Sequence, residues 1–416
     1  MRILHVSHQY APAVGGAEQY IQTLSEELAS RGHQVDVYTS RSREYMTWRN
    51  ELPPRERING VEVHRFRAIQ RRGYTWRLLD MGMRNYRVGL PRLWEPMIFI
   101  GNGPVMPGLG PAIRRNAGRY DVVHISNIHY AHAWIAFRAA RRSGLPVVAT
   151  PHLHAEQPAT YDVGYMRSLL HDAEAVLAVT SAERDFMHEE KLASRVVVGG
   201  NGLVMDDFPP LDQAEARQRL GVPQDAFVIL FLGRKVAYKG LDRTLAAFDV
   251  LRGRRSDVHL LAYGAETDES RRLWADYAAQ QGAPLGALPG LDVRDAVSNQ
   301  ERLAALAACD VFVMPSTGEA FGIVYLEAWA YGKPVIGANI RAVSSLIDDG
   351  VNGYLVDPAR PDQLVERLAV LAADPDKART MGQAGRGKLL RRYTTQRIGD
   401  IVESLYRRVI RHAGSE

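Results

Sequence analysis

The chain has very little cysteine. Cys309 is the single cysteine among 416 residues, which excludes an internal disulfide and a metal cage built from several thiolates. Because it precedes the apolar run DVFVMP, we expect it to pack in a core. The sequence also lacks any uninterrupted apolar stretch of about 18 residues, so no membrane-spanning helix is predicted. The first residues enter a predicted strand without a signal-peptide pattern, and the expected location is the cytoplasm.

Lysine is scarce as well, with six lysines among the 52 basic residues, so cationic sites rest almost wholly on arginine. The net charge of +5 is uneven, because residues 41–119 hold 16 arginines and only 6 acidic residues. Such a basic segment suits an anionic membrane or a phosphorylated acceptor. The alternative is an ordinary arginine-rich surface. No nucleic-acid partner is expected.

Strands that alternate with helical stretches predict an α/β protein with parallel sheets. Two such series are separated by a linker that follows Asn201-Gly202. We therefore expect two Rossmann-like domains facing a cleft. The first covers residues 1–205 plus about 395–416, and the second covers residues 206–394. The segment 70–118 fits this pattern least, and its run Met97–Ile113 is too broken by glycine and proline to span a membrane.

Two glutamates eight residues apart, Glu319 and Glu327, form the most informative motif. A short strand, a turn of small residues and a helix are predicted across this segment. Backbone amides at Gly322 and Ile323 would be unpaired at the helix start and suit an anion such as a phosphate. The two carboxylates suit the hydroxyls of a sugar, because a carboxylate is a poor direct partner for phosphate.

A second anion site is predicted in GRKVAYKG, residues 233–240. Arg234 and Lys239 lie five residues apart, and both precede a predicted helix. Two cations before a helix N-terminus make a site for the oxygens of a diphosphate. Gly15 and Gly16 follow the first strand and would let the backbone approach the same donor. The alternative is an ordinary strand-to-helix turn.

These motifs resemble the retaining family 4 glycosyltransferases of GT-B architecture. The resemblance covers nearly the whole chain and is carried by VGGAEQYIQTLSEELASRGHQVDVYT (14–39), NGLVMDDF (201–208), GRKVAYKG (233–240) and EAFGIVYLE (319–327), followed by EAWAYGKPVIG. It implies a hexosyltransferase for glycan biosynthesis that uses a nucleoside-diphosphate sugar and retains its anomeric configuration. It also implies a C-terminal helix that crosses back to the first domain.

The resemblance assigns roles to individual residues. Glu327 would bind the donor ribose, and Glu319 would bind the transferred sugar. His152 matches the family's histidine at that sugar, and His154 and Glu156 are close in sequence. His152 and Glu319 are therefore the predicted catalytic residues.

The acceptor is expected to be a glycan, a lipid-linked precursor or a small molecule. Contact with the inner face of the membrane through the first domain is a further expectation. The residues after VHLLAYG and the long stretch 282–300 depart from the family pattern near the expected base site, so the base stays open. The alternatives are a sugar-nucleotide epimerase or hydrolase on the same fold, and a non-catalytic nucleotide-sugar-binding subunit.

We predict catalysis without a metal or another cofactor. The Asp-x-Asp triplet, Asp374-Pro375-Asp376, lies far in sequence from the motifs and is interpreted as a helix connection. Arg234 and Lys239 would supply the electrostatic work that a metal does elsewhere. Extensive chelation should leave the initial transfer rate nearly unchanged. A rate abolished by chelator and restored by Mg²⁺ or Mn²⁺ would overturn this prediction.

Overall fold

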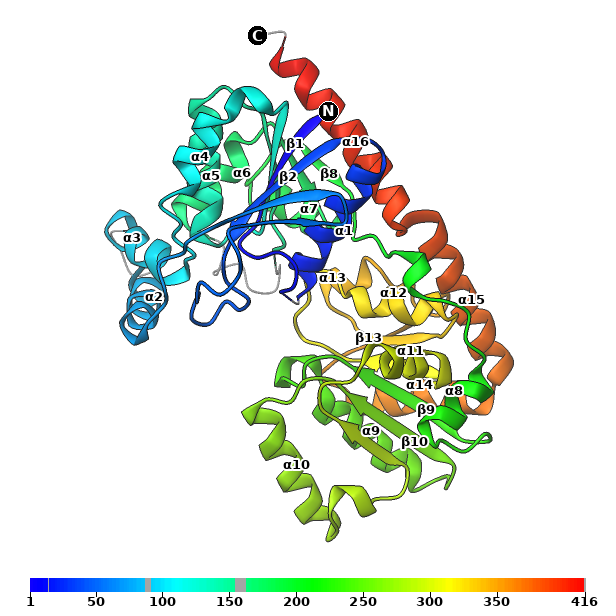
Figure 1. Ribbon diagram of the computed structural model, residues 1–416. Coiled ribbons are helices and arrows are strands. Elements are labelled where there is room, and N and C mark those ends of the chain that lie inside the picture. Colours follow the sequence, from blue (N-terminus) through cyan, green and yellow to red (C-terminus); the bar gives the residue numbers. More distant parts are fainter. Residues whose placement is uncertain (14, 87–90, 154–161, 415–416) are drawn as a thin grey trace. The chain divides into compact units, whose positions relative to one another are not determined.

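The computed structural model describes residues 1–13, 15–86, 91–153 and 162–414. These form two compact units, Met1–Gly202 with Thr395–Glu416 and Leu203–Thr394. Each unit has its own sheet with helices packed on it (Figure 1). The predicted pair of α/β domains with parallel sheets is confirmed. Within the described part of the chain, no helix is both long and apolar enough to cross a membrane.

The first unit contains an eight-stranded sheet in the order β3-β4-β2-β1-β5-β6-β7-β8. Every neighbouring pair is parallel except β3 and β4, which form an antiparallel pair at one edge. The strands are β1 (Arg2–Val6), β2 (Gln34–Ser40), β3 (Arg55–Ile58), β4 (Val61–Phe66), β5 (Val122–Ser126), β6 (Val147–Thr150), β7 (Ala175–Ala178) and β8 (Val196–Val198).

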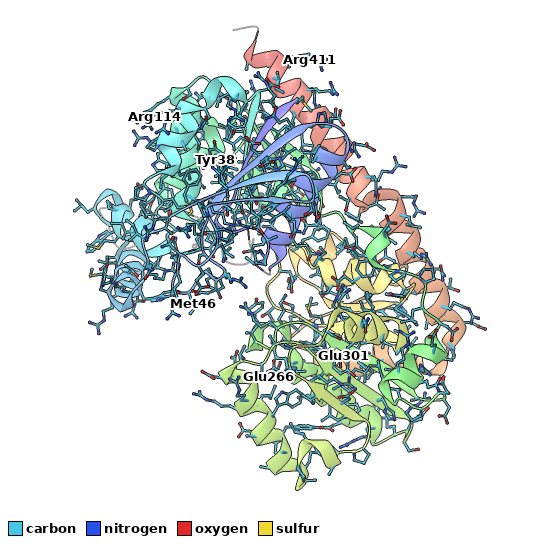
Figure 2. All side chains as sticks on the ribbon, in the orientation of Figure 1. Tyr38, Met46, Arg114, Glu266, Glu301 and Arg411 are labelled. Atoms are coloured by element: carbon cyan, nitrogen blue, oxygen red, sulfur yellow. The ribbon has the colours of Figure 1, made fainter. Side chains whose placement is uncertain are left out.

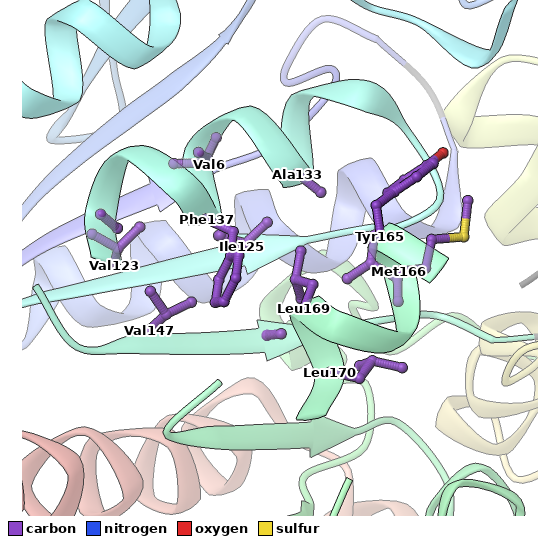
Figure 3. Packing of buried hydrophobic residues seen from close by; sticks show 14 of the residues in the cluster. Val6, Val123, Ile125, Ala133, Phe137, Val147, Tyr165, Met166, Leu169 and Leu170 are labelled. Atoms are coloured by element: carbon purple, nitrogen blue, oxygen red, sulfur yellow. The ribbon is translucent and has the colours of Figure 1, made fainter. Parts of the chain in front are cut away.

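Helices cover both faces of this sheet. Successive residues of a strand point to opposite faces, so each strand contributes to the core on either side. Val123 and Ile125 belong to the core under the helices of one face, whereas Val122 belongs to the core that includes α1 and the C-terminal helix (Figure 3). The helices are α1 (Gly16–Ser30), α2 (Gly73–Tyr86), α3 (Pro91–Asn102), α4 (Leu109–Arg115), α5 (Ala131–Arg142), α6 (Gly164–Asp172), α7 (Ser181–Glu189) and α16 (Thr395–Ala413). The segment 70–118 thus forms α2, α3 and α4.

The second unit has a six-stranded parallel sheet in the order β11-β10-β9-β12-β13-β14. Its strands are β9 (Phe227–Leu232), β10 (Val258–Tyr263), β11 (Leu291–Arg294), β12 (Val311–Met314), β13 (Val335–Ala338) and β14 (Gly353–Val356). Its helices are α8 (Gln213–Leu220), α9 (Leu241–Arg252), α10 (Asp268–Gln281), α11 (Asn299–Ala308), α12 (Ile323–Ala330), α13 (Arg341–Ser344), α14 (Pro361–Ala373) and α15 (Pro375–Arg392). Cys309 is fully buried, as expected, and burial raises the pKa of its thiol to about 12.

The C-terminal helix α16 packs beside α1 in the first unit (Figure 1). At its surface, Arg31 on α1 pairs with Asp400 at 2.8 Å. At its buried face, the Tyr406 hydroxyl lies 3.0 Å from His5 Nε2 and 2.5 Å from His124 Nδ1. Tyr406 therefore joins α16 to the two central strands β1 and β5.

The Ile21 carbonyl, at the end of this buried chain of hydrogen bonds, determines which group donates in each of them. Ser25 donates to the Ile21 carbonyl, which can only accept, so His5 Nδ1 must donate to Ser25. His5 Nε2 then accepts from Tyr406, and His124 Nδ1 donates to Tyr406. Both imidazoles are neutral in this chain, because burial lowers the pKa of His5 to about 3 and that of His124 well below its usual value.

Tyr406→Phe should lower the free energy of unfolding by about 2–4 kcal/mol. The change leaves His5 Nε2 without a donor and His124 Nδ1 without an acceptor, and a buried orphan group costs about 1–3 kcal/mol. Urea unfolding followed by circular dichroism measures the loss. Tyr331→Phe is the matched control, because it removes one half-buried hydroxyl that donates to the Pro209 carbonyl at 3.1 Å. Equal losses in the two variants would contradict the prediction.

Candidate functional site

Two loops that the sequence singled out lie together at the carboxyl ends of the strands of the second sheet. Strands β9 and β12 are parallel neighbours, so their carboxyl ends lie side by side and place the loops 233–240 and 315–322 together. The Thr317 amide donates to the Tyr238 carbonyl at 2.7 Å. The Lys239 ammonium also forms an ion pair with Glu319 across the loops. Residues 80 positions apart in sequence therefore share one site.

Lys239 and Glu319 are only slightly exposed, with side-chain exposures of 18% and 9%. An ammonium group has three donors and can hold Glu319 while it donates to a phosphate oxygen. A carboxylate has several lone pairs and can accept from a sugar hydroxyl while it keeps its lysine. The pair thus presents opposite charges to two kinds of ligand group, phosphate and hydroxyl.

Glycines start the helices at both loops. Gly322, at the N-cap of α12, has φ 90°, and a Cβ there would lie 2.7 Å from the Tyr325 ring. Gly240, at the N-cap of α9, has φ 81°, and a Cβ there would lie 2.5 Å from the Pro315 carbonyl oxygen. Side chains are excluded at both positions, so the first-turn amides of α12, including that of Ile323, are approachable by an anion.

Glu327 lies one turn into α12, where its carboxylate is buried and pairs with Arg302 of α11 at 2.7 Å. Burial raises the pKa of Glu327, and the Arg302 guanidinium partly offsets this shift. Arg302 could not be identified from the sequence. It belongs to no motif, and only the packing of α11 beside α12 brings it to Glu327.

The loop 233–240 holds a third cation, Lys235, besides Arg234 and Lys239. Arg234 is exposed. Lys235, by contrast, is 1% exposed, pairs with Glu266 and donates to the Arg294 carbonyl at 2.7 Å. Lys235 therefore fastens the loop to the β10–α10 connection, and its ammonium is buried away from any ligand.

The predicted residues of the first unit also lie at a sheet edge. Gly15 is the N-cap of α1, and a Cβ there would collide with the Glu18 carboxylate. Gly16 begins the helix and has open space around it. Glu18, which no motif indicated, has its Oε1 2.8 Å from His8 Nε2. Burial would raise the pKa of Glu18, but the imidazoles of His8 and His152 help to lower it to about 2.

His152 follows β6 in a left-handed conformation, with φ 56°. Its Nε2 lies 3.2 Å from the Ser126 hydroxyl, and its ring meets the edge of Tyr20 at 5.0 Å. Tyr20 in turn contacts Thr150, which hydrogen bonds to His124 of the buried chain around Tyr406. His152 is thus held by contacts from β5 and α1. His154 and Glu156 lie outside the described residues.

Glu183 on α7 holds the backbone around His152. Its Oε1 accepts from the Leu153 amide and its Oε2 from the Val179 amide, each at 2.6 Å. Complete burial raises the pKa of Glu183 to about 7, although these backbone hydrogen bonds and one from His152 oppose the shift. Glu183 is a positioning residue that no motif had indicated.

The arginines of the basic segment 41–119 divide into two groups. Arg65 and Arg71 are buried, and both donate to backbone carbonyls, those of Ala11 and of Tyr45, Gly101 and Asn102. They are structural. Arg67, Arg72, Arg77 and Arg84 are exposed, and of these Arg84 pairs with Asp80 at 2.9 Å. In the described ranges, no group of three His, Cys, Asp or Glu side chains could hold a metal ion.

Two family models match the two units. The model described as glycosyl transferase 4-like domain matches residues 15–202, and the model described as glycosyl transferases group 1 matches residues 212–388. Among curated proteins, the chain is 29% identical to a D-inositol 3-phosphate glycosyltransferase of Streptomyces avermitilis, covering 92% of this chain and 82% of the relative. A protein of the same name from Thermobispora bispora is 29% identical, covering 87% and 83%.

Solved structures match the fold over almost the full length. Sucrose-phosphate synthase from Thermosynechococcus elongatus has a TM-score of 0.76 at 20% identity, covering 99% of this chain and 100% of that one. The Anabaena protein HepE, in complex with UDP and glucose, has a TM-score of 0.68 at 21% identity, covering 97% and 99%. These likenesses establish the GT-B architecture.

Glu183 should make the stability depend on pH. Its pKa is about 7 in the folded protein and near its ordinary value when unfolded, so its stabilising contribution is complete at acidic pH and is lost as pH rises through 7. Between about pH 5 and about pH 8, the free energy of unfolding should fall on the order of 2–3 kcal/mol more for the wild type than for Glu183→Gln. Urea titrations at each pH measure this difference. Glu51→Gln, at an exposed position, should keep the wild-type slope. Parallel slopes for wild type and Glu183→Gln would disprove the assignment.

Proposed function

The chain belongs to the GT-B glycosyltransferases of the family 4 type, and from this membership we propose that it is a retaining hexosyltransferase. Its donor would be a nucleoside-diphosphate sugar, and its acceptor a phosphorylated or lipid-linked glycan precursor. The observation that carries this proposal is the junction of the two loops, where Lys239 and Glu319 form an ion pair beside the N-terminus of α12. A phosphate site and a hydroxyl site therefore adjoin.

The proposed chemistry depends on departure of the diphosphate. Negative charge grows on the leaving phosphate while positive charge grows on the sugar ring, and groups fixed in advance around the phosphate lower that barrier. We assign the leaving phosphate to Arg234, Lys239 and the amides at Gly322 and Ile323. No separate nucleophile is needed if the acceptor attacks from the face that the phosphate leaves. Catalysis would then proceed with retention and without a metal.

The remaining residues would orient the donor. We assign Glu319 to hydroxyls of the transferred sugar and Glu327 to the ribose, with the Arg302 guanidinium favouring the charged form of the Glu327 carboxylate against its burial. His152 is assigned to the outer hydroxyls of the donor sugar, and Gly15 and Gly16 to close approach of the backbone. The complex of HepE with UDP supports a uridine nucleotide as the first donor to test.

The acceptor proposal rests on charge. The curated relatives are named for an inositol phosphate, and this chain exposes Arg67, Arg72, Arg77 and Arg84 in its most basic segment. We propose an acceptor with a phosphate group, used by a cytoplasmic enzyme with peripheral contact at the inner face of the membrane. A soluble small acceptor is the alternative.

A panel of nucleotide sugars, incubated with and without phosphorylated acceptors, tests the proposal. Transfer predicts nucleotide release that is stimulated by one acceptor, with the sugar recovered on that acceptor in the donor's anomeric configuration. Release of free sugar alone would instead identify a hydrolase, and interconversion of the nucleotide sugar would identify an epimerase. Binding without turnover would identify a non-catalytic subunit.

Arg234→Ala should lower kcat/KM by an amount equivalent to about 2–4 kcal/mol, because a charge-assisted contact to the leaving group is lost. Its thermal stability should stay near that of the wild type, since Arg234 is exposed. Lys239→Ala should lower kcat/KM similarly but also lower stability, because Glu319 loses its partner in a site that is mostly buried. Arg254→Ala, an exposed control in the same unit, should change neither quantity. Near-normal turnover in the Arg234/Lys239 double variant would refute the diphosphate assignment.

A further inference from the structure

A cavity lies in the first unit, apart from every residue assigned above. It has a volume of about 560 Å³ and lies among α3, α4, α5 and α6. This volume falls within the range of small-ligand sites in proteins.

The walls of this cavity are apolar and aromatic. Phe99 of α3, Trp134 and Ile135 of α5 and Tyr165 of α6 line it, and Figure 3 shows Tyr165 beside the packed core of α5 and α6. On α4, Gly110 contributes no side chain, and a Cβ there would sit 3.5 Å from Ile135. A hydrocarbon chain would find aromatic and aliphatic contacts on several sides.

Three arginines complete the lining, namely Arg114 of α4, which is labelled in Figure 2, and Arg138 and Arg142 of α5. All three are exposed, and none has an ion pair or hydrogen bond from its guanidinium within the described chain. Arg138 contacts the Trp134 ring at 5.8 Å. The single acid of the lining, Glu95, accepts from the Tyr86 hydroxyl at 3.4 Å.

Unpaired guanidinium groups at the mouth of an apolar cavity favour an amphiphile with an anionic head. A guanidinium matches the geometry of phosphate and is the preferred side chain for binding it. The neighbouring α2 and α3 expose large apolar side chains, including Leu93 at 65%, Tyr74 at 56% and Ile100 at 45%. Apolar exposure beside a basic surface is typical of proteins that lie on a bilayer.

We propose that this cavity binds one acyl chain of an anionic bilayer phospholipid, with its phosphate held by Arg138, Arg142 and Arg114. The inference gives the proposed membrane contact a defined lipid site. It does not depend on the transfer reaction, because none of the residues assigned to the donor lines the cavity.

Co-sedimentation with vesicles tests the site. The wild type should bind phosphatidylcholine–phosphatidylglycerol vesicles and bind pure phosphatidylcholine vesicles much more weakly. Arg138→Gln/Arg142→Gln should lower the affinity for the anionic vesicles by about 10- to 30-fold, since each basic contact contributes about one factor of five. Arg391→Gln/Arg392→Gln, which removes two exposed arginines from α15, is the charge-matched control and should bind as the wild type does.

A second variant fills the cavity and keeps every arginine. Gly110→Leu should reduce the quenching of tryptophan fluorescence by acyl-brominated lipid, because the leucine side chain takes the space of the acyl chain. Trp134→Phe should reduce the quenching as well, because it removes the indole that lies in the cavity wall. Quenching unchanged in both variants would show that lipid meets the surface only, and would overturn the inference.

Failure of the wild type to bind anionic vesicles would overturn both the lipid site and the membrane contact. Inhibition of vesicle binding by inorganic phosphate as effectively as by short-chain phosphatidylglycerol would show that the acyl chain contributes nothing, which also overturns the inference. Nucleotide release in the donor panel, measured without lipid, reports the transfer activity separately.

Discussion

The parallel alignment of β9 and β12 is the constraint on which the candidate site depends. Parallel neighbours deliver their carboxyl ends to one edge, so the loops after both strands must meet there, whatever the distance between them in sequence. The Lys239–Glu319 pair and the Thr317–Tyr238 hydrogen bond then fix the loops against each other. Gly240 and Gly322 permit this approach because their backbones adopt positive φ where a side chain would collide.

Sequence reasoning worked where a local pattern reports directly on geometry. The alternation of strands and helices predicted two α/β domains, and the strand–loop–helix context of Glu319 and Lys239 predicted that both lie at helix starts. It failed where a contact depends on packing between distant elements. Arg302 reaches Glu327 only because α11 packs beside α12, and Glu183 reaches the backbone of residue 153 from a separate helix. Neither residue has a neighbouring motif that could have identified it.

For the same reason, the number of basic residues in a segment did not show which of them could bind a ligand. The arginines of residues 41–119 looked alike in sequence, yet Arg65 and Arg71 bind backbone carbonyls inside the fold while Arg77 and Arg84 face solvent. In the loop 233–240, Lys235 and Lys239 are four residues apart and have different surroundings. A buried cation costs energy unless it is paired, so burial selects a structural role for Lys235 and leaves Lys239 near the exposed edge.

Tyr406 gives the first unit an unusual order of assembly. Residues 1–202 emerge from the ribosome long before the helix Thr395–Ala413 is synthesised, so the early chain can form its sheet but leaves His5 and His124 without the hydroxyl that joins them. During that interval two imidazoles in the centre of the sheet lack one polar partner each. Until then the face of the sheet that α16 covers in the finished domain lacks that helix. The native core on this face includes Ile398, Val402 and Tyr406, so it can be completed only after the end of the chain has been synthesised.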